Sequence, residues 1–190
     1  FADFHIEQGA QLARDGQNNV FNAIESSSKP FVAAINGFAL GGGLELAMAC
    51  HLRVASENAK LGLPEVTLGL IPGYGGTQRL TKLVGKGRAF EMIATADMIS
   101  AEKAEKIGLV NYVVPASELI GTAEGLLSKI KQRAPQAIAA AIRATNAAVD
   151  AATNGYDIEI KAFADCFGTA DFKEGVSAFL EKRKPSFTGS

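Results

Sequence analysis

The feature that most constrains this chain is a cluster of glycines set between two apolar segments. Four of the seven residues Gly37–Gly43 are glycine, with the apolar run 30–35 before them and the apolar segment 44–50 after them. The first run is short and partly β-branched, which predicts a buried strand, and the second has the composition of a buried helix. Glycine between them allows unusual backbone dihedrals and lets a ligand approach the main chain closely. The sequence therefore predicts a strand, a tight turn and a helix.

The turn itself could take part in a reaction. A helix that begins near Gly42 presents unpaired N–H groups and the positive end of its dipole. Such a point suits an oxygen that gains negative charge during a reaction. Glu45 lies one turn into this helix, in an otherwise apolar stretch. A structural interpretation is equally compatible with this stretch alone: the glycines would allow close packing and Glu45 would face water.

A membrane-spanning helix must also be considered, because residues 31–50 carry one charge in twenty positions. Asn36, the glycines and Glu45 would make a poor membrane helix, so we reject this interpretation. The balance of charge is close to even, with 19 basic and 20 acidic residues and a net charge of −1. We therefore expect no nucleic-acid partner and no membrane partner.

A second glycine-rich stretch follows at residues 63–78, and Glu65 is its one charged residue. It is long for a connection inside a compact domain, and such loops are often functional. Its segment Gly73–Gly76 either binds an anion or simply turns the chain into the next helix. With two carboxylates, one could bind and activate a water while the other exchanges a proton with a carbon atom. Nearby backbone N–H groups could stabilise an enolate-like oxygen. Burial would raise the pKa of such a carboxylate toward neutrality.

The sequence contains few residues for disulfide bonds, metal sites or histidine-dependent catalysis. Cys50 and Cys166 are far apart and in no paired motif, so no disulfide framework is predicted. His5 and His51 are the two histidines, which leaves little for a zinc site or for Ser-His-Asp catalysis. We expect no metal site and no metal or redox cofactor.

Apolar periodicity and turn residues predict an α/β core over residues 1–133 and an all-helical extension over residues 134–190. The predicted strands are 30–35, 51–55, 60–62 and 109–114. The predicted helices are 6–26, 44–50, 77–84, 85–95, 100–108, 117–133, a helix that starts at Pro135, 156–167 and 171–184.

Three segments, 29–47, 61–80 and 170–185, closely resemble the crotonase (enoyl-CoA hydratase/isomerase) superfamily. The resemblance runs in order through the whole chain. It implies a crotonase-like spiral core of β-β-α turns, followed by helices that lie at the contacts of a trimer. Trimers of this superfamily commonly pair into hexamers, so we expect a homotrimer or a dimer of trimers.

Three residues match the catalytic positions of the superfamily. Gly42 resembles the residue whose N–H supplies one half of the oxyanion hole for the thioester carbonyl. Glu45 resembles the glutamate that holds and activates the attacking water. Glu65 resembles the glutamate that exchanges a proton with the α-carbon while it also binds that water.

Four further residues match positions that bind the substrate. Gly41 lies beside the oxyanion position, and Gly73 matches a loop glycine that lines the site. Phe163 and Lys182 fall at positions that touch coenzyme A in relatives, often from a neighbouring subunit. A plain packing role for Phe163 is an equal alternative.

The resemblance also concerns what precedes the chain. Relatives carry an N-terminal part that ends in an Ala-Gly-Ala-Asp-like loop, which supplies the second oxyanion N–H. The present chain starts where that loop ends, so we expect the native protein to have residues before Phe1. We further expect a cytoplasmic location, or the mitochondrial matrix in a eukaryote.

The resemblance implies an enoyl-CoA hydratase, which adds water across the double bond of a 2-enoyl-CoA thioester. Coenzyme A would then arrive as part of the substrate. One rival is another crotonase reaction, such as double-bond isomerisation, for which one carboxylate can suffice. The second rival is a non-catalytic relative that binds acyl-CoA. The presence of both Glu45 and Glu65 favours hydration over either.

Overall fold

The computed structural model describes residues 3–190, and these divide into two compact units. The first unit contains residues 3–25 and 31–123, and the second contains residues 26–30 and 124–190. The second unit begins earlier than the boundary predicted at residues 133 and 134. Within the second unit, Pro30 lines a pocket together with Leu127 and Lys131.

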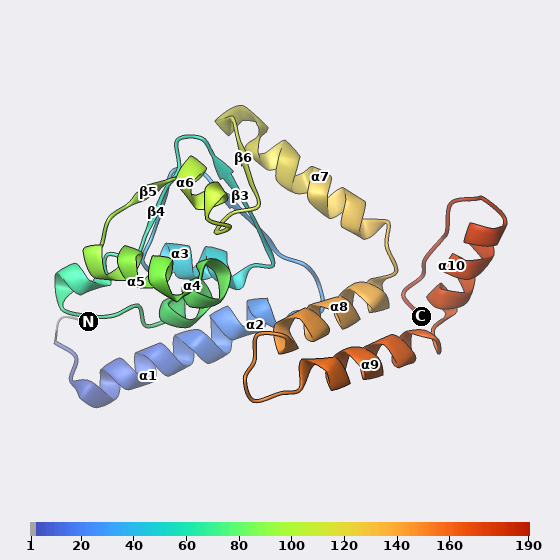
Figure 1. The fold of residues 1–190 in the computed structure, drawn as a ribbon, viewed down its shortest axis with the longest axis horizontal. Coiled ribbons are helices and arrows are strands. Elements are labelled where there is room, and N and C mark those ends of the chain that lie inside the picture. Colours follow the sequence, from blue (N-terminus) through green and yellow to red (C-terminus); the bar gives the residue numbers. More distant parts are fainter. Residues whose placement is uncertain (1–2) are drawn as a thin grey trace. The chain divides into compact units, whose positions relative to one another are not determined.

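The strands of the first unit form two three-stranded sheets (Figure 1). One sheet is parallel and contains β1 (Val32–Ile35), β3 (Leu52–Ser56) and β6 (Tyr112–Val114) in that order. The other contains β2 (Phe38–Leu40), β4 (Lys60–Gly62) and β5 (Ile99–Ser100), with β2 and β4 parallel and β4 and β5 antiparallel. The short strands β2 and β5 were not predicted.

The chain alternates between the two sheets as it advances. β1 joins the first sheet, β2 joins the second, and the helix α3 (Gly42–Ala49) leads back to β3 in the first sheet. β3 is followed by β4 in the second sheet, so the β-β pattern repeats. This alternation agrees with the spiral of β-β-α turns that the resemblance to the crotonase superfamily implies.

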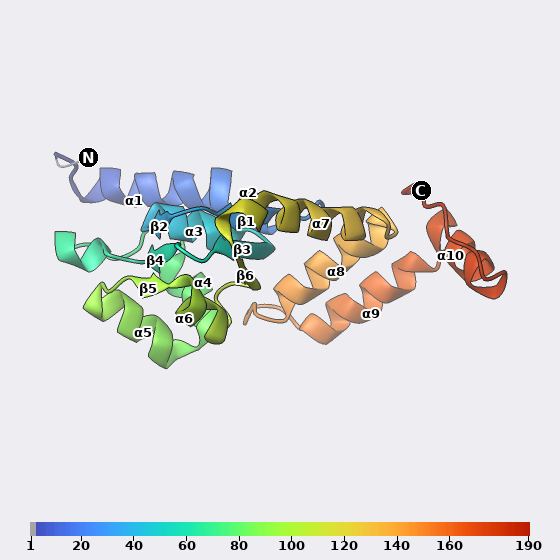
Figure 2. The same ribbon diagram turned by 90° about the horizontal axis from the view of Figure 1, so that it is seen from above.

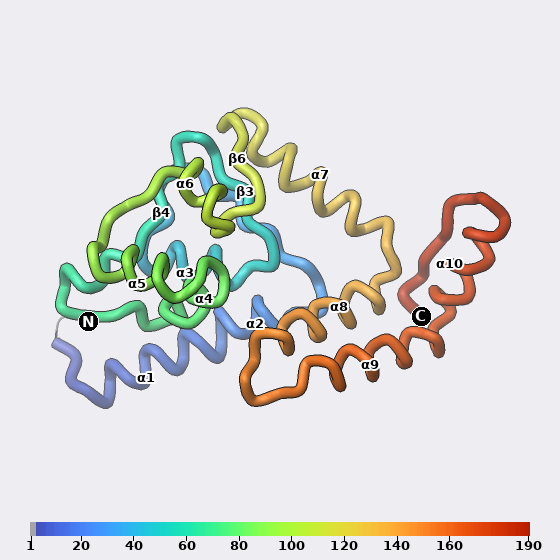
Figure 3. Tube along the Cα trace, in the orientation of Figure 1, coloured from blue at the N-terminus to red at the C-terminus, as the bar shows by residue number. Residues whose placement is uncertain are grey.

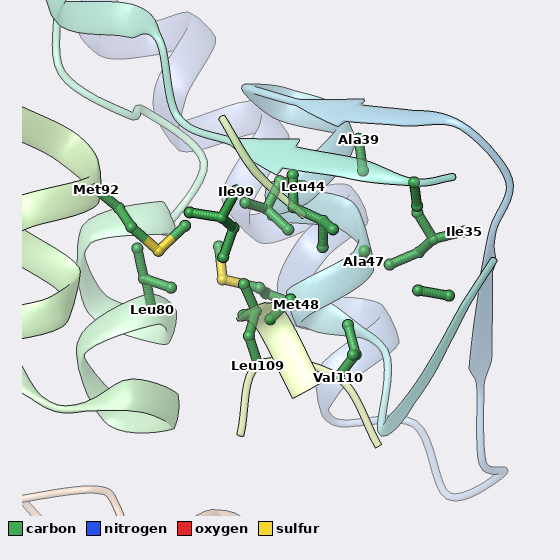
Figure 4. Close-up of a cluster of buried hydrophobic side chains, with 14 of the residues drawn as sticks. Ile35, Ala39, Leu44, Ala47, Met48, Leu80, Met92, Ile99, Leu109 and Val110 are labelled. Atoms are coloured by element: carbon green, nitrogen blue, oxygen red, sulfur yellow. The ribbon is translucent and has the colours of Figure 1, made fainter. Parts of the chain in front are cut away.

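Helix α3 lies in the core of this unit because its sequence is apolar nearly all round. Leu44, Leu80 and Leu109 have no exposed surface, and Met48 and Ile99 pack with them (Figure 4). Leu61 of β4 belongs to the same core and is also fully buried. The core therefore holds α3 against α4 (Gly76–Val84) and the strand β5. A helix fixed in this way can present its N-terminus with little freedom to move.

The predicted helix at residues 6–26 is present but is not regular throughout. It consists of α1 (Ile6–Gly16), a π-helical turn (Gln17–Phe21) and α2 (Asn22–Glu25). The helices α5 (Lys86–Thr95) and α6 (Ala101–Lys106) complete the first unit. Figure 2 shows α1 and α5 on opposite sides of the strand β4.

The helices that follow β6 end the chain. A 3-10 turn (Ala116–Glu118) leads into α7 (Leu119–Lys131), and α8 (Pro135–Ala147), α9 (Gly155–Cys166) and α10 (Ala170–Leu180) follow. Within the second unit, α8 and α9 run antiparallel to each other (Figure 3). None of the helices within residues 3–190 is both long and apolar enough to cross a membrane.

Helix α10 ends four residues before the predicted limit at Lys184, at Leu180. The end is a Schellman motif: Arg183 N donates to Ala178 O at 3.0 Å and Lys182 N donates to Phe179 O at 3.2 Å. Lys182 takes the left-handed conformation with φ +56°, a position where glycine is usual. The sequence carries no glycine there, which is why the helix end was not predicted.

Candidate functional site

The start of α3 is the first component of the site. Gly41 has φ +54° and ψ −127°, which a residue with a side chain would adopt only under strain. Its N–H donates to Gly62 O at 3.0 Å, which fixes the turn to β4. Gly42 and Gly43 are then the first two residues of the helix. Their N–H groups have no partner within the helix, so they are available to an acceptor in front of it.

Glu45 is the second component and is almost completely buried, with 1% of its surface exposed. Its Oε1 accepts two backbone hydrogen bonds, from Tyr74 N and Gly76 N, both at 2.8 Å. Its Oε2 accepts no hydrogen bond within residues 3–190. Burial is the main reason that the pKa of Glu45 lies above its ordinary value, and the two N–H donors partly offset the effect. The carboxylate is therefore fixed through one oxygen and open at the other.

Glu65 is the third component, and it starts a 3-10 turn (Glu65–Leu68) after Pro64. Its Oε2 is buried and has no hydrogen-bond partner among the described residues. Its Oε1 lies against Gly41, where an added Cβ would be 3.1 Å from it. Buried carboxylate oxygens are normally satisfied, so this oxygen keeps an unused capacity to accept a hydrogen bond. The Glu65 charge also raises the pKa of Glu45, so the two carboxylates lie close enough to interact.

The segment Gly73–Gly76 settles one of the alternatives that the sequence left open. Its amides do bind an anion, and that anion is the Glu45 carboxylate of the same chain. Gly76 must be glycine, since a Cβ there would lie 2.8 Å from both Glu45 Oε1 and Pro72 Cβ. The loop also turns the chain into α4, so both interpretations of the segment hold.

The helical segment 6–25 supports this loop from behind. Gln17 Nε2 donates to Gly73 O at 2.7 Å, and the Phe21 ring stacks on Tyr74 with centroids 5.0 Å apart. The Tyr74 ring also lies beside Gly42, where an added Cβ would be 3.6 Å from it. A side chain at Gly16 would collide with the same ring. The π-helical turn therefore carries the residues that place the loop, as π-turns often do near functional sites.

A buried arginine at the other end of the loop was not predicted. Arg79 Nη1 donates to Tyr74 O at 2.8 Å, and Arg79 Nη2 donates to Asn22 Oδ1 at 2.8 Å and to Glu25 Oε2 at 2.7 Å. Arg79 belongs to the segment 61–80 that resembles the crotonase superfamily. Its partners Asn22 and Glu25, however, lie 57 and 54 positions away in the sequence. Local patterns carry no signal for such contacts.

The C-terminal end of α3 is held by a second buried arginine. Arg53 Nη1 donates to Cys50 O at 2.7 Å and Arg53 Nε donates to Leu109 O at 2.7 Å. A cation at this end of a helix interacts favourably with its dipole. Both ends of α3 are thus fixed, so the first N–H groups of the helix have little freedom to change direction.

The structure brings together five of the predicted site residues, namely Gly41, Gly42, Glu45, Glu65 and Gly73, all in the first unit. Phe163 and Lys182 belong to the second unit. Phe163 is 67% exposed and meets Phe167 edge-on, with ring centroids 5.1 Å apart, so it is not a core residue. Within residues 3–190, no three or more His, Cys, Asp or Glu side chains cluster closely enough to hold a metal ion.

The family follows from a comparison with known proteins. The family model described as enoyl-CoA hydratase/isomerase matches residues 5–190. The chain belongs to the enoyl-CoA hydratase/isomerase family. The short-chain-enoyl-CoA hydratase of Clostridium acetobutylicum is 49% identical over 168 residues, which cover 88% of this chain and 64% of that protein. The crotonyl-CoA hydratase of Syntrophomonas wolfei is 49% identical over 169 residues, which cover 88% of this chain and 65% of that protein.

The chain thus spans just under two thirds of the length of these two family members. Among solved structures, the enoyl-CoA hydratase from Bacillus anthracis aligns with all of this chain and 73% of its own, with 42% identity and a TM-score of 0.91. This likeness confirms the predicted fold class, a crotonase-like α/β core with a helical C-terminal part.

Proposed function

We propose that the protein hydrates 2-enoyl-CoA thioesters to 3-hydroxyacyl-CoA. The observation that carries the proposal is the pair of glutamates beside Gly42. Glu45 keeps one oxygen open, and Glu65 has a buried oxygen that no described residue satisfies. Both lie at the start of a helix with unpaired N–H groups. The relatives named as enoyl-CoA hydratases support the same reaction.

In the proposed reaction, Glu45 and Glu65 hold one water between their open oxygens. The water oxygen forms a bond to the β-carbon while Glu45 takes a proton from the water. Glu65, which enters the reaction as the acid, delivers its proton to the α-carbon. The proton that Glu45 took from the water then passes to Glu65, which restores the starting state of both groups. One water adds across one double bond, so atoms and charge balance without a metal or redox cofactor. The raised pKa of Glu45 suits a group that must both accept and release a proton.

The thioester oxygen becomes enolate-like as the water attacks the β-carbon. We propose that Gly42 N–H donates to this oxygen and that the positive end of α3 adds to the effect. A bond of this kind strengthens in the transition state, so it accelerates the reaction as well as binding the substrate. Gly41 contributes the turn that points the N–H forward, and Gly73 contributes the carbonyl that fixes the loop.

The test is a hydration assay on the full-length protein. Loss of absorbance at the enoyl thioester band is followed with short and long 2-enoyl-CoA substrates. We expect turnover to a 3-hydroxyacyl-CoA, identified by mass as substrate plus water. Conversion of a 3-enoyl-CoA to its 2-enoyl isomer without addition of water would favour isomerisation. Binding of acyl-CoA without any turnover would favour a non-catalytic relative.

We also propose that Lys182 contacts coenzyme A. Its left-handed backbone costs stability that glycine would avoid, and such a cost is typical of positions kept for function. Lys182→Gly should raise the free energy of unfolding, by at most about 1–2 kcal/mol, which is the cost of a left-handed conformation for a residue with a side chain. The same change should raise KM for the acyl-CoA. A stabilised protein with an unchanged KM would contradict the contact.

The helical C-terminal part supports a proposal about assembly. Phe163, Phe179 and Leu180 are large apolar residues with 67%, 82% and 73% of their surface exposed. Phe163 also meets Phe167, which is 50% exposed, and contiguous apolar surface of this kind is typical of contact surfaces. We propose that they contribute to a trimer or a dimer of trimers, and light scattering that finds monomer at micromolar concentration would contradict this.

We also propose that the protein is located in the cytoplasm, or in the mitochondrial matrix in a eukaryote.

A further inference from the structure

We infer that the ion pair between Glu25 and Arg79 positions Glu45 from behind, by holding the loop Tyr74–Gly76 whose amides bind its carboxylate. Glu25 and Arg79 are positioning residues in this inference, because neither touches the reacting atoms. The inference rests on the proposed function for its effect on turnover, but its structural part can be tested separately.

The contacts form a continuous chain from α2 to Glu45. Glu25 Oε2 accepts from Arg79 Nη2 at 2.7 Å and from Arg79 Nε at 3.1 Å. Arg79 Nη1 donates to Tyr74 O at 2.8 Å. Tyr74 N and Gly76 N, on either side of Gly75, then donate to Glu45 Oε1. Each link is within hydrogen-bond distance, so a shift of the guanidinium moves the donors of Glu45.

The ion pair is needed because Arg79 is buried. Its side chain is 7% exposed, whereas that of Glu25 is 36% exposed. A buried guanidinium requires an acceptor for its charge, and loss of that acceptor is costly. Its planar fork donates in several fixed directions, which a single ammonium group cannot reproduce. Arg79 can therefore hold α2 and the loop in one geometry.

Gly75 explains why the loop needs such support. Its φ of +92° makes the turn possible, and a side chain there would collide with Arg79 Nη1. The guanidinium thus occupies the space beside the turn, and glycine alone would leave the turn free to adopt other conformations. If the loop relaxes, Glu45 loses its donors and its open oxygen no longer points at the water.

The first arm of the test measures turnover in the full-length protein with Glu25→Ala and Arg79→Met. We expect kcat to fall about 10- to 100-fold, since displacement of a catalytic group by about 1 Å can cost about 100-fold. KM should change less than about twofold, because the acyl-CoA contacts remain. The control is Glu7→Ala, which removes one exposed charge from the start of α1. Normal kcat in folded Glu25→Ala would overturn the inference.

The second arm measures the pKa of Glu45 by NMR on protein labelled with ¹³C-glutamate, with the signal assigned through Glu45→Gln. Removal of the negative Glu25 would, by charge alone, leave Arg79 less compensated and lower the pKa of Glu45. Loss of the two N–H donors would raise it instead. We expect a rise in Glu25→Ala and no change in Glu7→Ala. Arg79→Met also removes a positive charge that lowers the pKa of Glu45, so its pKa is expected to rise whether or not the donors are lost, and Glu25→Ala is the deciding variant. The charges that act on Glu45 from neighbouring elements are those of Glu65 and Arg79.

The outcomes separate the two proposals. A fall or no change in the pKa of Glu45 in Glu25→Ala would show that the pair does not hold the donors, and would overturn the inference. Should Arg79→Met fail to fold, Glu25→Ala at its partly exposed position still decides the matter. Absence of hydration by the unmodified protein would overturn the proposed function alone, because the NMR measurement does not depend on turnover.

Discussion

Two buried carboxylates, one in each unit, both accept backbone hydrogen bonds but differ in how many of their oxygens do so. Glu45 in α3 is 1% exposed and Asp171 in α10 is 2% exposed, and each accepts backbone N–H groups from a loop. Asp171 uses both oxygens: Oδ1 accepts from Thr188 N at 2.7 Å and Oδ2 accepts from Gly189 N at 3.0 Å. Glu45 uses Oε1 for both of its donors.

The difference teaches how to tell a structural carboxylate from a functional one. Burial and backbone donors are the same in the two cases, so neither property distinguishes them. What differs is the oxygen that is left over. Asp171 uses both oxygens to hold the C-terminal residues at the start of α10, whereas Glu45 Oε2 accepts no hydrogen bond from residues 3–190.

The largest expected effect is on turnover, with Glu45→Gln and Glu65→Gln. Each should reduce kcat by about 10²- to 10⁴-fold, since each removes a general acid or base. The folded state raises the pKa of Glu45, so ionisation of Glu45 opposes folding and stability is lost as pH rises. Glutamine has no such charge, so Glu45→Gln should melt no lower than the unmodified protein near neutral pH. Near-normal turnover in a folded variant would contradict the proposed roles.

Gly76→Ala should also reduce turnover, by about 100-fold, without any change to a carboxylate. The added Cβ would lie 2.8 Å from Glu45 Oε1 and must displace it, and small displacements are costly in catalysis. Gly87→Ala in α5 is the matched control, because nothing lies within 4 Å of its Cβ position. Steady-state kinetics on both variants would check this, and equal rates would show that Glu45 tolerates the displacement.

Asp171→Ala should affect stability and not chemistry. It removes the acceptor of Thr188 N and Gly189 N, and a hydrogen bond to a charged group contributes about 1.5–3 kcal/mol. Chemical denaturation should therefore show a lower free energy of unfolding, while kcat per folded site stays unchanged. A loss of kcat at full stability would erase the distinction between the two carboxylates.

The smallest effect concerns pH. Arg183 and the Ser186 N–H lower the pKa of Glu174 from its ordinary value of 4.5 to about 2. Because the folded pKa is depressed, the stabilisation is complete above the unfolded value and is lost as pH falls through the folded one. Thermal melts between about pH 4.5 and 2 should show a decline that is weaker in Glu174→Gln. Identical declines in the two proteins would mean that the pair of Glu174 and Arg183 does not contribute to the pH dependence of stability.

Much of the fold follows from local patterns. The strands β1 and β3 and the helix α4 were predicted because apolar periodicity and turn residues mark them clearly. The strand β2 was missed because glycines flank its three residues, which made the segment resemble a turn. Its strand character comes from pairing with β4, and the sequence of β2 alone does not contain that partner.

The site divides in the same way. Glu45 and Glu65 could be found because each is a lone charge in an apolar, glycine-rich stretch. Arg79 and Asp171 could not, since charged residues are ordinary in a helix and their burial depends on segments far along the chain. The sequence shows which groups can react, and the tertiary structure shows which groups hold them.

The π-helical turn at Gln17–Phe21 has a consequence for how this segment can change in evolution. An extra residue in a helix shifts the angular phase of everything beyond it by about 100°. Gln17 and Phe21 serve the Tyr74 loop, while Asn22 and Glu25 serve Arg79, so one phase relation satisfies both sets. A single-residue deletion within the turn would restore a regular helix and rotate one set away from its partners. The segment can accept substitutions there more readily than a change of length.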